Sequence, residues 1–272
     1  MLQNHYNVIM NPGRYSPELA AAIYVSRRSY AVESISSDRA PVIFDVGCGY
    51  GSESFMFASL GARVLSVDRS SRQIEIALKR KRYFEEKFGK ALNITFRTED
   101  LNDYVPEEDD ISLSWVASVL AAIPDQDSLL RRVCSATRTG GRIMVTDMNL
   151  MNPLFLWKEW KRRRRALKTC PDFAQHGRFS DMLRRKNRVG ARYYGKDNGS
   201  RFDDVQFFHP KTLAHLLTST GFRIERISFS GFVPPLTLGN VFCATENFLG
   251  KVPGIKTFGY FYTVTGIKQP KE

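Results

Sequence analysis

Two acidic residues and three closely spaced glycines are the residues of this sequence best suited to binding a ligand. Asp45 leads into Gly47, Gly49 and Gly51, and Asp68 follows at the end of the next apolar segment. Glycines at this density let the backbone turn sharply and approach a ligand with no Cβ atom in between. A carboxylate offers two acceptor oxygens to a diol such as that of ribose. The pattern therefore predicts a nucleoside site.

The segments around these residues supply the elements that position them. Residues 42–44 form a short apolar run with β-branched and aromatic side chains, which is typical of a buried strand. Residues 52–60 fit a helix that Gly61 ends, and residues 63–67 fit a second strand. A strand, a glycine loop, a helix and a second strand with Asp68 at its tip form the nucleoside-binding half of a doubly wound parallel sheet.

The spacing of the glycines indicates which nucleoside is bound. A dinucleotide fingerprint would place its third small residue at Ser52, whereas the third glycine here is Gly51. The pattern Asp45-x-Gly47-x-Gly49-x-Gly51 instead resembles the first motif of class I S-adenosylmethionine-dependent methyltransferases.

The resemblance implies S-adenosylmethionine as cofactor and gives roles to individual residues. The glycine loop, with Cys48 as a small residue rather than a redox group, would pass close to the methionine part. Asp45 would lie near the ammonium group, and Asp68 would accept hydrogen bonds from both ribose hydroxyls. Arg69, the next residue, is assigned to the same site.

A third strand is expected over residues 93–98, after a long helix over 71–88 that Ser70 caps. In the family that this chain resembles, an acidic residue at the end of this strand binds the adenine amino group, and the next residue packs near the ring. Asp100 and Leu101 fit these two places.

The fourth strand is expected over residues 110–116, with an apolar stretch to residue 123. Similar methyltransferases often carry His or Glu near the end of this stretch, where this chain has Ala121 and Ala122. A base from this loop is therefore not expected. Trp115 is assigned to the methyl-transfer pocket, with burial in the core as the alternative.

Residues 142–146 are expected to form the fifth strand, and Asp147 and Asn149 follow at the end where substrate-contacting residues project. Methyltransferases of the catechol type place metal ligands here and also need an acid at the end of the fourth strand. This chain has Ser114 and Trp115 there. We therefore expect no metal.

Oxygen methylation usually requires a base to remove a proton. His209, at the start of the helix that begins at Pro210, is the first candidate, with helix capping or packing as its alternative role. His176 and Asp147 are further candidates. A strand over 222–229 and a last strand over 257–268 complete the expected sheet.

The predicted fold is therefore one α/β domain over residues 1–272, a doubly wound, seven-stranded Rossmann-like sheet. The resemblance implies the strand order 3-2-1-4-5-7-6, with the last strand antiparallel. Residues 1–40 are expected to form an N-terminal arm and helix.

The largest departure from a minimal fold is an insertion over residues 150–205. It holds fifteen Lys or Arg and six Asp or Glu, so most of the chain's net charge of +12 lies here. Its start combines Phe155, Trp157 and Trp160 with a basic run over 161–165. We interpret the insertion as a substrate lid; a packed helix with a solvated basic face and a membrane-surface contact are the alternatives. Residues 193–200 are expected to be loop.

The favoured function is O-methylation of a small molecule, such as a glycoside, polyketide or lipid-linked sugar of natural product biosynthesis, with an anionic acceptor as one option. The alternatives are a tRNA or rRNA methyltransferase, which the positive charge favours, and a membrane-associated cofactor-binding module. Four scattered cysteines, no secretory pattern at the N-terminus and no apolar run of 18 residues favour a cytoplasmic protein.

Overall fold

The computed structural model of this chain describes residues 31–35, 38–153, 207–232 and 251–270. It also describes the backbone of 188–194 and 201–206 and short pieces at 155–157, 160–161, 164, 245 and 248–249. Residues 1–30 of the predicted N-terminal arm and helix, and His176, lie outside the described residues.

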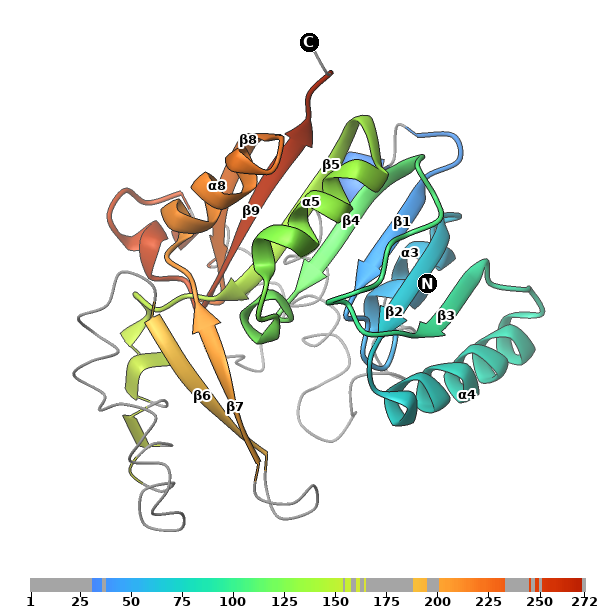
Figure 1. The fold of residues 1–272 in the computed structure, drawn as a ribbon, viewed down its shortest axis with the longest axis horizontal. Helices are drawn as coiled ribbons and strands as arrows, with labels where there is room; N and C mark the ends of the chain where they lie inside the picture. Colours follow the sequence, from blue (N-terminus) through green and yellow to red (C-terminus); the bar gives the residue numbers. More distant parts are fainter. Residues whose placement is uncertain are drawn as a thin grey trace.

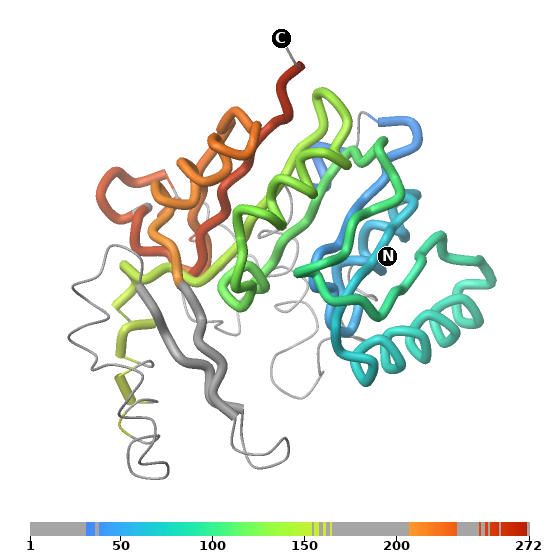
Figure 2. Tube along the Cα trace, viewed as in Figure 1, coloured from blue at the N-terminus to red at the C-terminus, as the bar shows by residue number. Residues whose placement is uncertain are grey.

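A seven-stranded sheet forms the centre of the molecule (Figure 1). Its order is β3-β2-β1-β4-β5-β9-β8, which is 3-2-1-4-5-7-6 when these strands are counted along the chain, so the predicted topology is confirmed. The first five strands are parallel, and β9 runs antiparallel between β5 and β8 (Figure 2). The strands are β1 Val42–Val46, β2 Arg63–Asp68, β3 Ile94–Thr98, β4 Ile111–Ala117, β5 Thr137–Met148, β8 Phe222–Ser230 and β9 Phe261–Lys268.

Helices cover both faces of this sheet (Figure 1). On one face, side chains of α5 and α8 join a core cluster with residues of β1, β4, β5 and β9. On the other, α3, Phe84 of α4 and the helical residues Ala31 and Ile35 form a second cluster. The helices are α3 Ser52–Ser59, α4 Ser71–Phe88, α5 Gln126–Ala136 and α8 Pro210–Ser219, with short 3-10 turns η1 Leu120–Ala122 and η4 Ile255–Phe258.

Several helix ends follow the signals in the sequence. The hydroxyl of Ser70 accepts from the backbone N–H of Gln73 at the start of α4, and Gly89 ends that helix in the left-handed conformation. Asp125 caps α5 in the same way as Ser70 caps α4, through the N–H of Ser128.

Three predicted boundaries are wrong. Strand β5 begins at Thr137 rather than 142, because Thr137 pairs with Ile111 across an irregularity in the ladder. Strand β9 begins at Phe261, after the η4 turn that occupies part of the predicted strand. Tyr193 and Tyr194, expected in a loop, end strand β6 (Arg188–Tyr194), which pairs with β7 (Arg201–Phe207) in a separate hairpin.

Candidate active site

The glycine loop between β1 and α3 has the conformation that its sequence requires. Gly47, Gly49 and Gly51 have φ angles of 72°, 54° and 74°. A Cβ atom on Gly47 would lie 2.5 Å from Val119, and one on Gly51 would lie 2.8 Å from Phe96. The first and third glycines are therefore required by packing within the protein itself as well as by their backbone angles.

Asp68 joins the end of β2 to this loop. One carboxylate oxygen accepts from the backbone N–H of Gly49 at 2.9 Å, and the other accepts from Ser70 N–H at 2.9 Å. Each oxygen has two acceptor positions, so the carboxylate keeps capacity for the two hydroxyls of a ribose. Arg69 follows it in the sequence and is exposed.

Asp45 lies beneath the loop and is only 3% exposed. The hydroxyl of Ser54 donates to its carboxylate at 2.5 Å. Burial, together with the negative charges of Glu53 and Asp68, raises the pKa of Asp45 to about 7, although the Ser54 hydrogen bond opposes the shift. This concentration of acid in a basic protein favours a cationic group as the ligand.

Cys48 has no sign of a reactive thiol. Burial, followed by the charges of Asp45 and Asp68, raises the pKa of Cys48 well above its ordinary value. The thiol therefore stays protonated and acts as a small buried side chain of the loop.

The loop after β3 is held in place by one arginine of α5. Arg132 donates from Nη2 to the carbonyl oxygens of Leu101 and Asn102 at 2.7 Å each, and from Nε to the carbonyl of Tyr104 at 3.1 Å. Leu101 is buried, whereas Asp100 is exposed and accepts from the backbone and side chain of Asn102. The predicted adenine pair thus lies on a fixed turn, and Arg132 is the residue that sequence reasoning missed.

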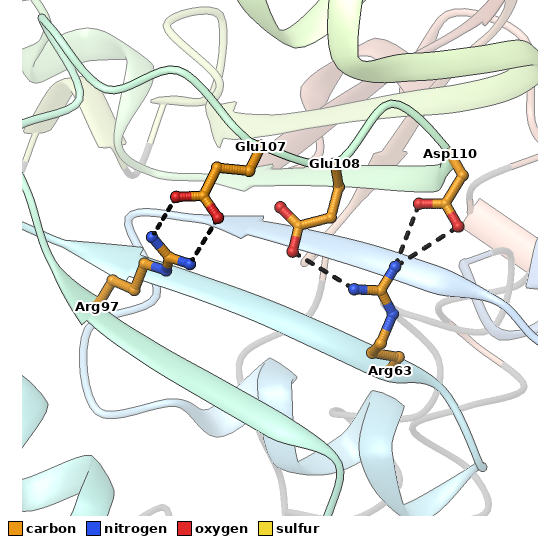
Figure 3. Close-up of polar contacts among 5 residues, drawn as sticks. All are labelled: Arg63, Arg97, Glu107, Glu108 and Asp110. Atoms are coloured by element: carbon orange, nitrogen blue, oxygen red, sulfur yellow. Dashed lines mark hydrogen bonds and ion pairs between the residues drawn. The ribbon is translucent and has the colours of Figure 1, made fainter.

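Ion pairs hold the rest of the same connection against the sheet (Figure 3). Arg97 of β3 pairs with Glu107 at 3.1 Å. Arg63 of β2 pairs with Glu108 at 3.4 Å and with Asp110 at 3.2 Å. Because these pairs are partly exposed, they order the chain more than they stabilise the fold.

Trp115 lies in the core on the α3 face. It is 3% exposed and packs edge-on against Phe57, with ring centroids 5.9 Å apart. Of the two roles expected for Trp115, the structure shows packing in the core. Val119, just after the end of β4, is the side chain that packs against the glycine loop. The residue before it, Ser118, has a φ angle of 56° although it is not a glycine.

At the end of β5, Asp147 and Asn149 have different roles. Asp147 is 2% exposed, accepts from the N–H of Met148 at 2.7 Å, and pairs in register with Tyr262. Burial and the charge of Asp147 raise the pKa of Tyr262 well above its ordinary value. Asn149 is fully buried and donates to the carbonyls of Thr257 and Gly259, so its predicted substrate contact is replaced by a structural one.

His209 stands at the N-terminus of α8. Its Nδ1 accepts from the backbone N–H of Lys211 at 3.2 Å, so the helix-capping alternative is part of its role. A base function would therefore use Nε2. The neighbouring Phe208 carbonyl accepts from the hydroxyl of Tyr262 at 3.2 Å, which links the start of α8 to the strand opposite Asp147.

A small apolar cluster joins η1 to the segments around the insertion. Ala121, Leu150, Phe155 and Phe207 are all buried in it. The ring of Phe155 lies 5.5 Å from that of Phe207 and 6.0 Å from that of Tyr260. The small side chain of Ala121 belongs to this cluster.

Comparison with known proteins decides the family. A model of the methyltransferase domain matches residues 37–203, which is more than half of the chain. The chain belongs to this family. The predicted resemblance to class I S-adenosylmethionine-dependent methyltransferases is thereby confirmed, and with it the cofactor expected for the family.

Two curated relatives show how far the similarity extends. This methyltransferase is 26% identical over 145 residues to methyltransferase GfsG of Streptomyces halstedii, covering 53% of this chain and 50% of that protein. It is 26% identical over 187 residues to a ubiquinone biosynthesis O-methyltransferase of Coxiella burnetii, covering 68% of this chain and 65% of that protein. The chain thus spans half to about two-thirds of the length of these relatives.

Solved structures show the same fold. A methyltransferase of Methanosarcina mazei superposes with a TM-score of 0.59 at 16% identity, covering 89% of this chain and 99% of that one. One from Listeria monocytogenes gives 0.57 at 13% identity, covering 91% and 100%. At these identities the likeness establishes the fold alone.

The residues of the methyltransferase fit the family's cofactor. A loop with three positive-φ glycines, a carboxylate with spare acceptor positions and a buried acid near other acids match a nucleoside that carries positive charge. Within the described part of the chain, no three acidic, histidine or cysteine residues lie close enough to hold a metal ion. No helix in the described ranges is both long and apolar enough to cross a bilayer.

Proposed function

We propose that this methyltransferase transfers a methyl group from S-adenosylmethionine to an oxygen of a small acceptor of the glycoside, polyketide or lipid-linked sugar class. The observation that carries the proposal is the acidic site at the glycine loop, where Asp68 spans Gly49 and Ser70 above the buried Asp45. The name of the Coxiella relative, an O-methyltransferase, supports oxygen as the methylated atom.

The chain's own contribution is to bind, orient and remove a proton. When bound, S-adenosylmethionine supplies an activated methyl group, and its sulfur leaves as a neutral thioether. Asp45 and Asp68 would hold the two ends of the bound cofactor, which would direct its methyl group to the edge of the sheet where β4 and β5 end. The hydroxyl of the acceptor would give its proton to a base, for which Nε2 of His209 is the first candidate and Asp147 the second.

The insertion over 150–205 acts as a lid in this proposal. Its first residues, Leu150 and Phe155, and Phe207, which follows its end, are buried in one apolar cluster with Ala121 of η1. A lid attached there would exclude water from the transfer. The excess of Lys and Arg in the insertion favours an acceptor that carries negative charge.

Replacing His209 tests the base. His209→Asn keeps a capping side chain at the start of α8 but has no basic nitrogen. We expect turnover with labelled S-adenosylmethionine to fall by about a hundredfold, with unchanged affinity for S-adenosylhomocysteine. His215→Ala, on the exposed side of the same helix, is the control. Full turnover in His209→Asn would transfer the base role to Asp147.

The net charge of +12 keeps an RNA acceptor as the second candidate. If RNA is the acceptor, methyl incorporation into tRNA or rRNA should fall steeply as salt rises, because each phosphate contact releases counterions. A small uncharged acceptor would show almost no such dependence, so a salt series with both acceptor classes separates the two functions.

A further inference from the structure

The residues after β5 display two aromatic–cation pairs on one helical face. Trp157 is 50% exposed, with the ammonium of Lys161 lying 3.7 Å from its ring centroid. Trp160 is 38% exposed, with the guanidinium carbon of Arg164 at 4.8 Å. Positions 157, 160, 161 and 164 are spaced i, i+3, i+4 and i+7, which places all four on one stripe.

This stripe faces away from the body of the domain. Phe155 is 4% exposed and packs on Phe207 and Tyr260, so it marks the inward side. At about 100° per residue, the four stripe residues lie roughly 140° to 240° around the helix from Phe155. The two indoles are therefore exposed because their side of the helix is turned away from the core cluster.

Further apolar side chains are exposed at the base of this helix. Asn149 and Asn152 bind the backbone of residues 257–259, which ties η4 to the start of the helix. Met151 on one segment is 38% exposed, and Ile255 and Phe258 on the other are each 45% exposed. We call the seven exposed residues of these two segments the docking surface: Met151, Trp157, Trp160, Lys161, Arg164, Ile255 and Phe258.

The chemistry of the docking surface fits one partner. Indole rings favour the boundary between water and hydrocarbon, and long basic side chains extend from that boundary to phosphate groups. The sequence adds positive charge along the same stretch, with a basic run over 161–165. RNA would also attract the cations and stack on the indoles, but it would leave Met151, Ile255 and Phe258 without a role.

We propose that the docking surface binds the headgroup layer of an anionic phospholipid membrane. The indoles enter the boundary region, and Lys161 and Arg164 move from the rings to lipid phosphates. No span of the bilayer is involved. The proposal does not depend on the acceptor or on the catalytic base.

Vesicle flotation of the full chain tests this. We expect binding to vesicles of phosphatidylglycerol and phosphatidylcholine, and weak binding to phosphatidylcholine alone. Trp157→Ala/Trp160→Ala should lower the partition coefficient about tenfold, because binding scales with buried apolar area. Trp115 is 3% exposed, so a blue shift of tryptophan emission on binding would report Trp157 and Trp160.

A matched control lies on another helix. Tyr83 of α4 is 47% exposed and has Lys87 at 5.7 Å from its ring, the same i, i+4 arrangement. Tyr83→Ala should leave vesicle binding unchanged, and every variant should bind S-adenosylhomocysteine like the wild type. Equal binding to both vesicle types, an unaffected double variant, or equal loss in Tyr83→Ala would overturn the proposal. Binding to RNA but not to vesicles would also overturn it, while intact S-adenosylhomocysteine binding would leave the proposed function standing.

Discussion

The functional edge of the sheet has a cofactor half, around the glycine loop and Asp68, and an acceptor half, around Asn149 and Tyr262. The two halves are built from contacts that join residues at different separations in the sequence. In the cofactor half, Asp68 reaches Gly49, 19 positions away, and Ser54 reaches Asp45, 9 positions away. In the acceptor half, Asn149 binds Thr257 across 108 positions and Tyr262 binds Phe208 across 54. The hydrogen bonds of the glycine loop and Asp45 in the first half thus join residues close in the sequence. The second exists only when β9 returns to pair with β5, so its side chains can change without disturbing the cofactor.

The strongest test of the comparison removes Asp68. Asp68→Ala should weaken S-adenosylhomocysteine binding by about a hundredfold, because charge-assisted hydrogen bonds to the ribose and the anchor on Gly49 are lost together. Calorimetric titration measures it. Asp110→Ala, which breaks only an exposed ion pair to Arg63 on the same strand, should bind normally. Wild-type affinity in Asp68→Ala would end the assignment of this edge to the nucleoside.

Asn149 provides the corresponding test of the acceptor half. Asn149→Ala leaves the buried carbonyls of Thr257 and Gly259 without their donor, which should cost about 2 kcal/mol of unfolding free energy. Denaturant unfolding measures the loss, and S-adenosylhomocysteine affinity should stay near that of the wild type. Asn102→Ala, a local asparagine of the cofactor half, should cost far less. A large loss of cofactor affinity in Asn149→Ala would show that the two halves are coupled.

The raised pKa of Asp45 predicts a pH dependence confined to the cofactor half. A cationic ligand needs the ionised carboxylate, so with a pKa of about 7 the affinity should fall about tenfold between pH 8 and pH 6. Stability changes in the opposite sense. The folded state holds the proton more tightly, so this stabilisation is full below the ordinary Asp value and is lost as pH rises through about 7.

Asp45→Asn tests whether the pH dependence of affinity and that of stability both come from Asp45. It should flatten the pH dependence of S-adenosylhomocysteine binding and remove this contribution to the pH profile of unfolding. If the variant keeps the wild-type pH profile in both titrations, the titrating group is another residue.

The smallest effect is expected at Arg132, which ties α5 to the loop after β3. Arg132→Lys keeps the charge but loses the fork that binds the carbonyls of Leu101, Asn102 and Tyr104, so cofactor affinity should fall about fivefold. Amide hydrogen exchange at residues 101–104 should rise, while the glycine loop stays protected. Arg131→Lys is the control, since Arg131 pairs only within α5, with Asp127. Equal exchange in both variants would remove the positioning role.

The accuracy of sequence reasoning follows the same division. The glycine loop between β1 and α3, the position of Asp68 at the end of β2 and the cap at Ser70 were predicted correctly, because each depends on neighbours within one supersecondary unit. Trp115 was left between two roles, and Asn149 and the start of β5 were misjudged, because distant residues set these features: Phe57, Thr257 and Ile111. A local sequence pattern does not predict which distant residue a buried side chain will contact.

The sequence by itself therefore located the glycine loop and the strands and helices around it, since glycine conformation and hydrophobic periodicity act over short stretches of chain. Its resemblance to class I methyltransferases supplied the family and the strand order. Only the tertiary structure showed that Ala121 receives Phe155 and Phe207, that Arg132 holds the turn after β3, and that Trp157 and Trp160 face outward. These contacts depend on how strands far apart in sequence come together, and the energy of burying a side chain is decided by that assembly.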